Sequence, residues 1–143
     1  MILQQALKKC LADSFAFSLK TQFFHWNVTG QDFYQYHELF GKIYEEVQEA
    51  SDTIAELIRQ LDEVAPGSLG RFKELTTIND ADSVPDIKSM VNVLEQDNRI
   101  VLASLLTAYK IAEEMGELGI SNEIQDRISA HEKHGWFLRA SMK

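Results

Sequence analysis

Apolar residues recur every three or four positions along most of this chain, a period typical of amphipathic helices. The first such stretch runs from Ile2 to about Val28, and Gly30 supplies a stop after it. Asp32 is then a candidate N-cap for a second helix, with Gln35 three residues on, as in a capping box. The apolar positions of the first stretch are Leu3, Leu7, Cys10, Leu11, Phe15, Leu19 and Phe23.

Three further stretches of the chain have apolar residues with the same period. The second runs from Phe40 to Leu61 and ends before Pro66. The third begins near Pro85, a residue tolerated in the first turn of a helix, and we expect Gly116 and Gly119 to close it. A last helix is predicted from Ser121, with apolar or aromatic residues at Ile124, Ile128, Trp136, Phe137 and Leu138.

The connection between the second and third stripes, residues 65–84, holds most of the helix breakers, and residues 69–75 within it could form one short helix. Too little chain lies on either side of this connection for two independent cores. We therefore expect a single domain over residues 1–143. The predicted fold is an all-α, ferritin-like four-helix bundle with a short helix in the long connection between the second and third long helices.

Composition narrows the class of protein. The chain has 143 residues, of which 45% are hydrophobic and 25% charged, as in ordinary globular proteins. No apolar run reaches the ~18 residues of a membrane span, and the N-terminal residues do not resemble a signal peptide. The lone cysteine, Cys10, excludes an internal disulfide framework. We therefore expect a cytoplasmic protein without a membrane partner. The net charge of −8 does not favour a general nucleic-acid-binding surface.

The chemistry available to this chain is that of imidazole and carboxylate. No Glu-x-x-His motif, Gly-rich phosphate loop or Cys-x-x-Cys pair is present. Asp52 and Glu56 are four residues apart and share one helical face. His25 and His37 flank the turn at Gly30, where two antiparallel helices would bring them together. Taken separately, such acids are more often a solvated edge, and such histidines are more often unrelated.

Helix length constrains any site built from these four residues. His37 and Asp52 lie fifteen residues apart on one helix, which is ~22 Å at ~1.5 Å per residue. Bonds from metal to ligand are ~2 Å long. One chain therefore cannot bring both residues to one ion, and a shared site needs two chains that meet about a two-fold axis. Imidazole with carboxylate suits Fe(II), but also zinc or manganese.

Four blocks of sequence carry a family resemblance. They are His25-Trp26-Asn27-Val28-Thr29-Gly30-Gln31-Asp32-Phe33, His37-Glu38-Leu39-Phe40, Ile43-Tyr44-Glu45-Glu46-Val47 and Asp52-Thr53-Ile54-Ala55-Glu56. Together they strongly resemble the Dps proteins, the mini-ferritins that protect DNA during starvation. The stretch Glu132–Arg139 also resembles the last helix of that family.

The resemblance implies a dodecameric hollow shell, a homo-oligomer with ferroxidase sites at its two-fold interfaces. His25 and His37 of one subunit would face Asp52 and Glu56 of its partner, with Glu56 a candidate bridge and Trp26 beside the site. The implied reaction is oxidation of Fe(II) by hydrogen peroxide or dioxygen, followed by storage of ferric iron in the cavity. Such a reaction limits oxidative damage.

The sequence departs from the Dps pattern in three places. Gly41 stands where many members carry an aspartate, which leaves the second iron position in doubt. The first helix begins almost at Met1, so we do not expect the Lys-rich tail of DNA-binding members. With a charge of −8 in every subunit, we expect DNA binding to be weak or absent. Residues Glu113, Glu117 and Asp126 are candidates for an acidic three-fold pore, although Leu118 and Asn122 replace acids nearby.

Two other interpretations stay open at this stage. The chain could form a non-enzymatic DNA-condensing or structural cage with a vestigial metal site, or its site could hold a metal other than iron. A second pair of histidines, His131 and His134, is spaced i, i+3 on the last helix. We expect structural or solvated roles for these two residues.

Overall fold

The computed structural model describes all 143 residues and contains five helices and no strand. The all-α prediction and the short helix in the long connection are confirmed. None of the helices is both long enough and apolar enough to cross a membrane. The helices are α1 (Leu3–Asn27), α2 (Phe33–Gln60), α3 (Leu69–Leu75), α4 (Ile87–Glu114) and α5 (Leu118–Ala140).

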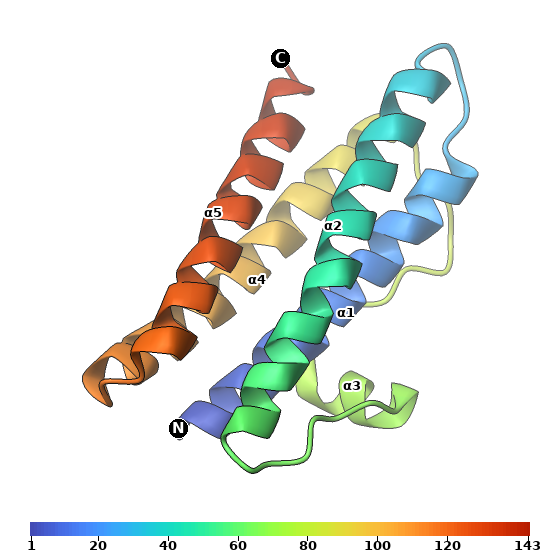
Figure 1. Cartoon of the computed structure of the whole chain (residues 1–143). Helices are drawn as coiled ribbons and strands as arrows, with labels where there is room; N and C mark the ends of the chain where they lie inside the picture. Colours follow the sequence, from blue (N-terminus) through green and yellow to red (C-terminus); the bar gives the residue numbers. More distant parts are fainter.

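The four long helices form a bundle of two antiparallel pairs (Figure 1). Helix α1 packs against α2, helix α4 packs against α5, and contacts between α1 and α4 join the two pairs. The connection that follows α2 carries α3 along the side of α1 and then returns to the opposite end of the bundle, where α4 begins (Figure 1). Helices α2 and α4 consequently run in the same direction, which is the ferritin-like connection.

Most helix ends follow from the local sequence. Gly30 and Gly116 both have positive φ, +116° and +71°, a conformation that glycine adopts without steric cost. At the second of these turns the Glu117 N–H donates to the Ala112 carbonyl at 2.9 Å, which closes the end of α4. Helices α3 and α4 are capped by side-chain oxygens of Ser68 and Asp86.

Asp32 is the N-cap residue of α2, as predicted, but it makes no side-chain capping bond, because its ψ of 22° is not the extended conformation of a typical N-cap. Two other predictions about helix ends were wrong. Helix α5 begins at Leu118, three residues before Ser121. Gly119 therefore lies inside α5, since the turn at Gly116 reverses the chain by itself.

The core is one cluster of 25 buried residues drawn from all four long helices, from Val28 in the turn after α1 and from Ile78 in the long connection. Helix α1 is buried on more than one side because α2, α3 and α4 all contact it. As a result it buries polar residues such as Asp13 and Lys20 as well as its apolar stripe. Helix α5 also differs from the amphipathic expectation, since Arg127 and His131 are buried on its inner side.

Candidate metal centre

His25 and His37 lie together where α1 ends and α2 begins. Their rings are stacked, with centroids 3.9 Å apart and planes inclined by 15°. The Nδ1 atom of His25 lies 2.6 Å from the His37 carbonyl oxygen, and Nδ1 of His37 lies 2.8 Å from the His25 carbonyl oxygen. The turn at Gly30 therefore produces a reciprocal pair in which each backbone orients the other residue's ring.

These two hydrogen bonds determine the tautomer of each ring. A carbonyl oxygen only accepts, so each Nδ1 must carry the proton and donate it. In the neutral ring Nε2 then keeps its lone pair, and neither Nε2 atom has a hydrogen-bond partner within the chain. A hydrogen bond at the far nitrogen is the usual way in which proteins orient a metal-binding histidine. Each ring thus offers an Nε2 lone pair that no group of the same chain occupies.

Aromatic rings extend the stack on both sides. Phe33 packs against His37 with ring centroids 4.9 Å apart, and Tyr44 lies against His25 with centroids 5.3 Å apart. Both histidines are half-buried. The flanking rings limit how far either imidazole can turn.

Asp52 and Glu56 lie further along α2, where both side chains are exposed and make no ion pair or hydrogen bond within the chain. No three residues among the His, Cys, Asp and Glu of one chain come close enough to hold a metal ion. The structure thus brings the two histidines together and leaves the two acids elsewhere, as the length of α2 requires.

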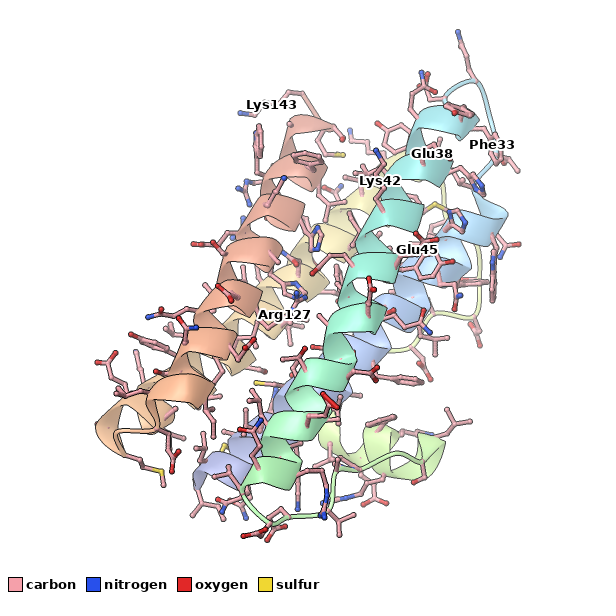
Figure 2. All side chains as sticks on the ribbon, in the orientation of Figure 1. Phe33, Glu38, Lys42, Glu45, Arg127 and Lys143 are labelled. Atoms are coloured by element: carbon pink, nitrogen blue, oxygen red, sulfur yellow. The ribbon has the colours of Figure 1, made fainter.

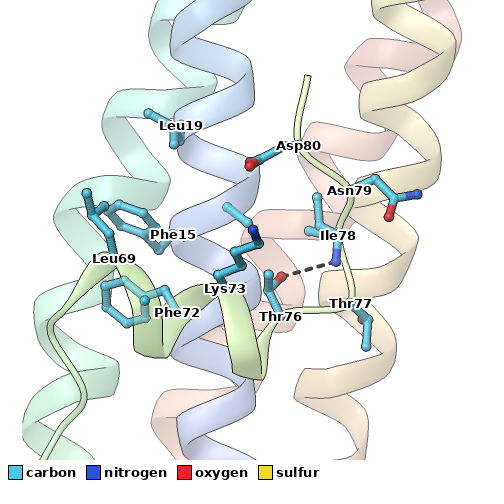
Figure 3. A pocket seen from close by; sticks show the side chains of 12 residues that line it. Phe15, Leu19, Leu69, Phe72, Lys73, Thr76, Thr77, Ile78, Asn79 and Asp80 are labelled. Carbon is cyan, nitrogen blue, oxygen red and sulfur yellow. Dashed lines mark hydrogen bonds between the residues drawn. The ribbon is translucent and has the colours of Figure 1, made fainter. Parts of the chain in front are cut away.

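Apolar side chains surround this region without a covering element. Trp26 is 62% exposed, next to His25, and Leu19 on the same helix is 43% exposed. Toward the other end of α1, an open hollow lies between α1, α3 and the segment after α3 (Figure 3). The apolar side chains that line this hollow are Phe15, Ala16, Leu19, Leu69, Phe72 and Ile78.

A second group of histidines and charged residues occupies the middle of the bundle between α2 and α5. Arg127 reaches from α5 toward α2 (Figure 2). Its guanidinium donates to both carboxylate oxygens of Glu46. Nε2 of His134 donates to Glu46 at 2.8 Å. His131 is fully buried, with Nδ1 2.8 Å from the Asn98 side-chain oxygen and Nε2 3.1 Å from the Arg127 guanidinium. Nearby charge is also paired, since Lys20 and Asp97 form a buried ion pair at 2.7 Å.

Burial and neighbouring charge together shift the pKa values of these groups. Burial alone would raise the pKa of Glu46, but hydrogen bonds from His134 and Arg127 and the nearby positive charge outweigh it and lower the pKa to about 2. Burial, followed by the charge of Arg127, holds the pKa of His131 well below its ordinary value. Burial also raises the pKa of the Cys10 thiol to about 12, so this cysteine is not a thiolate ligand.

Comparison with known proteins agrees with the helix arrangement. Residues 4–143 match the family described as the ferritin-like domain. DNA protection during starvation protein 2 of Bacillus anthracis is 29% identical, over 95% of this chain and 93% of that protein. The crystal structure of a Dps protein from Vibrio cholerae superposes with a TM-score of 0.94 at 30% identity, covering 99% of this chain and 89% of the other.

The chain belongs to the Dps branch of the ferritin-like family. Two further similar proteins come from other organisms. An uncharacterised low temperature-induced protein of Nostoc is 32% identical, over 94% of this chain and 76% of that protein. Antigen TpF1 of Treponema pallidum superposes with a TM-score of 0.95 at 29% identity, covering 99% of this chain and 91% of the other.

The acidic residues expected at a pore of this Dps protein lie around the turn between α4 and α5. Glu113 and Asp126 are exposed, and Glu117 is the residue that precedes α5. Tyr109 donates its hydroxyl to Glu113, and this hydrogen bond raises the pKa of the Tyr109 hydroxyl. Glu113 is thus held in place by a neighbour on its own helix. Their part in a three-fold pore stays a prediction.

Sequence reasoning missed two features of this region. One is the contact between Gly41 and the ring of His25, which a glycine inside a long helix could have signalled. The other is the group formed by Glu46, Arg127 and His131. Helical spacing places Arg127 and His131 on one face of α5, but no sequence signal identifies Glu46 on α2 as their partner.

Proposed function

We propose that this Dps protein oxidises Fe(II) at sites formed where two copies meet. His25 and His37 of one copy bind the ferrous ion together with Asp52 and Glu56 of the second copy. Hydrogen peroxide or dioxygen is the oxidant, and ferric iron is stored inside a closed, dodecameric shell. The observation that supports this most strongly is the stacked imidazole pair, whose hydrogen-bonded Nδ1 atoms leave both Nε2 atoms free for a metal.

The reaction follows from the charges of its parts. Each Fe(II) gives up one electron, and two such electrons with two protons convert one hydrogen peroxide molecule to two water molecules. Two carboxylates attract the Fe(III) product more strongly than the Fe(II) substrate, because the Coulomb energy grows with the charge of the ion. Two neutral imidazoles alone would lack this preference. The acids are therefore the part of the site that favours oxidation.

Exposed apolar side chains run from the histidine end of α1 to α3 and support a second copy as the partner. Trp26 and Leu19 on α1, and Leu69 on α3, expose 62%, 43% and 74% of their surface. A monomer gains nothing from exposing such large side chains to water. A two-fold contact would bury this surface and carry the acids of each copy to the imidazoles of the other.

Two further aspects belong to the same proposal. With Gly41 in place of a carboxylate near the histidines, we propose one tightly bound iron per site; zinc or manganese could take the same ligands in competition. DNA binding is not part of the proposed function, since the net charge of −8 per copy repels phosphate.

Co-expression of two inactive variants tests the proposal. One variant lacks both imidazoles, through His25→Ala and His37→Ala. The other lacks both carboxylates, through Asp52→Ala and Glu56→Ala. In a mixed pair of subunits, one of the two sites keeps all four native ligands and the other keeps none. Random pairing leaves about a quarter of the sites intact.

The initial rate of Fe(II) oxidation, followed by stopped-flow absorbance after peroxide addition, should therefore be near background for each variant alone. It should return to about a quarter of the wild-type rate in the mixture. Light scattering and mass spectrometry control for assembly and for equal incorporation. A mixture that stays at background contradicts the shared site, and unchanged rates in both separate variants contradict the assigned ligands.

A further inference from the structure

Gly41 lies in the interior of α2, directly beneath the ring of His25. A Cβ atom at this position would lie 2.9 Å from Cε1 and 3.1 Å from Nδ1 of His25. The glycine is buried, and it is not one of the residues with positive φ. The backbone therefore does not require glycine, which is among the least favourable residues inside a helix. The ring of His25 occupies the place that a side chain at position 41 would fill.

The ring cannot move aside without loss of its other contacts. Its Nδ1 atom is 2.6 Å from the His37 carbonyl oxygen, and its face is stacked on the His37 ring. The ring of Tyr44 lies close by, with centroids 5.3 Å apart. A displacement of a few tenths of an ångström away from position 41 would lengthen the hydrogen bond or press on one of these rings. Any such movement also redirects Nε2, the atom offered to a metal.

We propose that Gly41 is a positioning residue for the imidazole pair. Its missing side chain lets the ring of His25 lie against α2, so that the two Nε2 atoms present one rigid, two-nitrogen site for a divalent cation. This inference rests on the proposed function, because it concerns the same two ligands. It goes beyond that function in predicting that a methyl group at position 41, which touches no metal, weakens metal binding.

A metal-free double-mutant cycle tests the steric part of this proposal. The thermal midpoint of the apo protein is measured for wild type, Gly41→Ala, His25→Ala and the double variant. With the ring removed, Gly41→Ala should raise the midpoint by about 2–4 °C, as glycine to alanine normally does inside a helix. With the ring present, the gain should vanish or reverse.

Gly119→Ala is the matched control for this cycle. Gly119 is also helical, and a Cβ there would meet nothing within 4 Å. Its effect on the midpoint should be the same with and without the His25 ring. An equal gain for Gly41→Ala in both backgrounds overturns the proposal. Light scattering on each sample confirms that the same assembly is compared.

Anaerobic titration with Co(II) tests the consequence for the metal. Visible absorbance and calorimetry report the ligand field and the affinity without any turnover. Gly41→Ala should bind Co(II) about tenfold more weakly and with shifted absorbance bands, as loss of ligand orientation does at other metal sites. Gly119→Ala should match wild type. Wild-type affinity and spectrum in Gly41→Ala overturn the role of Gly41 alone. If wild type itself binds no Co(II), or His37→Ala binds it as well as wild type, the proposed function fails instead.

Discussion

The two histidine pairs of this protein differ in how many of their ring nitrogens form hydrogen bonds within the fold. His25 and His37 give their Nδ1 atoms to backbone carbonyls and keep both Nε2 atoms free. In the other pair, His131 has both ring nitrogens engaged, by Asn98 and by Arg127, and Nε2 of His134 is bound to Glu46. His134 keeps its Nδ1 free, but the neighbouring ring of His131 has no free nitrogen. Two free nitrogens on stacked rings, rather than the presence of histidine, therefore mark the candidate metal centre.

Burial explains why the two pairs differ. His131 lies in the middle of the bundle, where an unpaired polar atom would carry a large desolvation cost, so neighbours from α4 and α5 satisfy it. The pair where α1 ends and α2 begins is only half-buried, so water can solvate its free nitrogens. The positive charge of Arg127 at the centre also disfavours a cation there.

The largest expected effect separates the two pairs by function. His25→Ala with His37→Ala should lower the initial rate of Fe(II) oxidation at least about 100-fold, because both nitrogen ligands are lost. The unfolding free energy should change little. His131→Ala with His134→Ala should do the opposite, with a rate within about twofold of wild type and a loss of about 3 kcal/mol in stability. Stopped-flow absorbance and urea unfolding measure the two quantities. Similar rate losses in both double variants would show that the pairs are not functionally distinct.

A smaller effect on stability is expected for Arg127, the buried charged residue between α2 and α5. Arg127→Ala removes the guanidinium that binds Glu46 and contacts His131, and should lower the unfolding free energy by about 2–3 kcal/mol. Arg71→Ala is the matched control, since its i, i+3 ion pair with Glu74 is exposed at the surface. Its loss should be below about 0.5 kcal/mol in urea unfolding. Equal losses would mean that the buried pair contributes no more than a surface pair.

The smallest effect is a dependence of stability on pH below 6.5 in the metal-free protein. The pKa of His131 is lowered in the folded state, so below its ordinary value of 6.5 the unfolded chain binds a proton that the folded chain does not. Stability should therefore fall as the pH decreases from 6.5, by at most about 1.4 kcal/mol per pH unit for one proton. His131→Gln should remove this part of the slope in urea unfolding.

Glu46 titrates in a separate window and does not disturb that measurement. Its pKa is lowered to about 2 from the ordinary 4.5, so its contribution is present above pH 4.5 and disappears only as the pH falls toward 2. An unchanged slope between pH 5 and 6.5 in His131→Gln would contradict the role given to His131.

Much of the fold could be predicted because the helices carry regular signals. The apolar period located all four long helices, and the short helix at residues 69–75 was placed at its observed bounds. The errors lie at the start of α5, at Ser121 and Gly119, because the positive φ of Gly116 reverses the chain before either residue. The polar inner side of α5 was not predicted, since Arg127 and His131 are stabilised there by partners on other helices.

For the candidate site, the sequence alone determined which four side chains are available and, through the length of one helix, that His37 and Asp52 of one chain cannot meet at an ion. Only the tertiary structure decided which histidines have a free nitrogen. That depends on whether a carbonyl, an amide, a carboxylate or a guanidinium lies within about 3 Å of a ring. Such contacts come from residues 4 to 88 positions away in the chain, and most of them come from another helix. The role proposed for Gly41 also depends on the tertiary structure. Only the antiparallel packing of α1 and α2 places the His25 ring against this glycine.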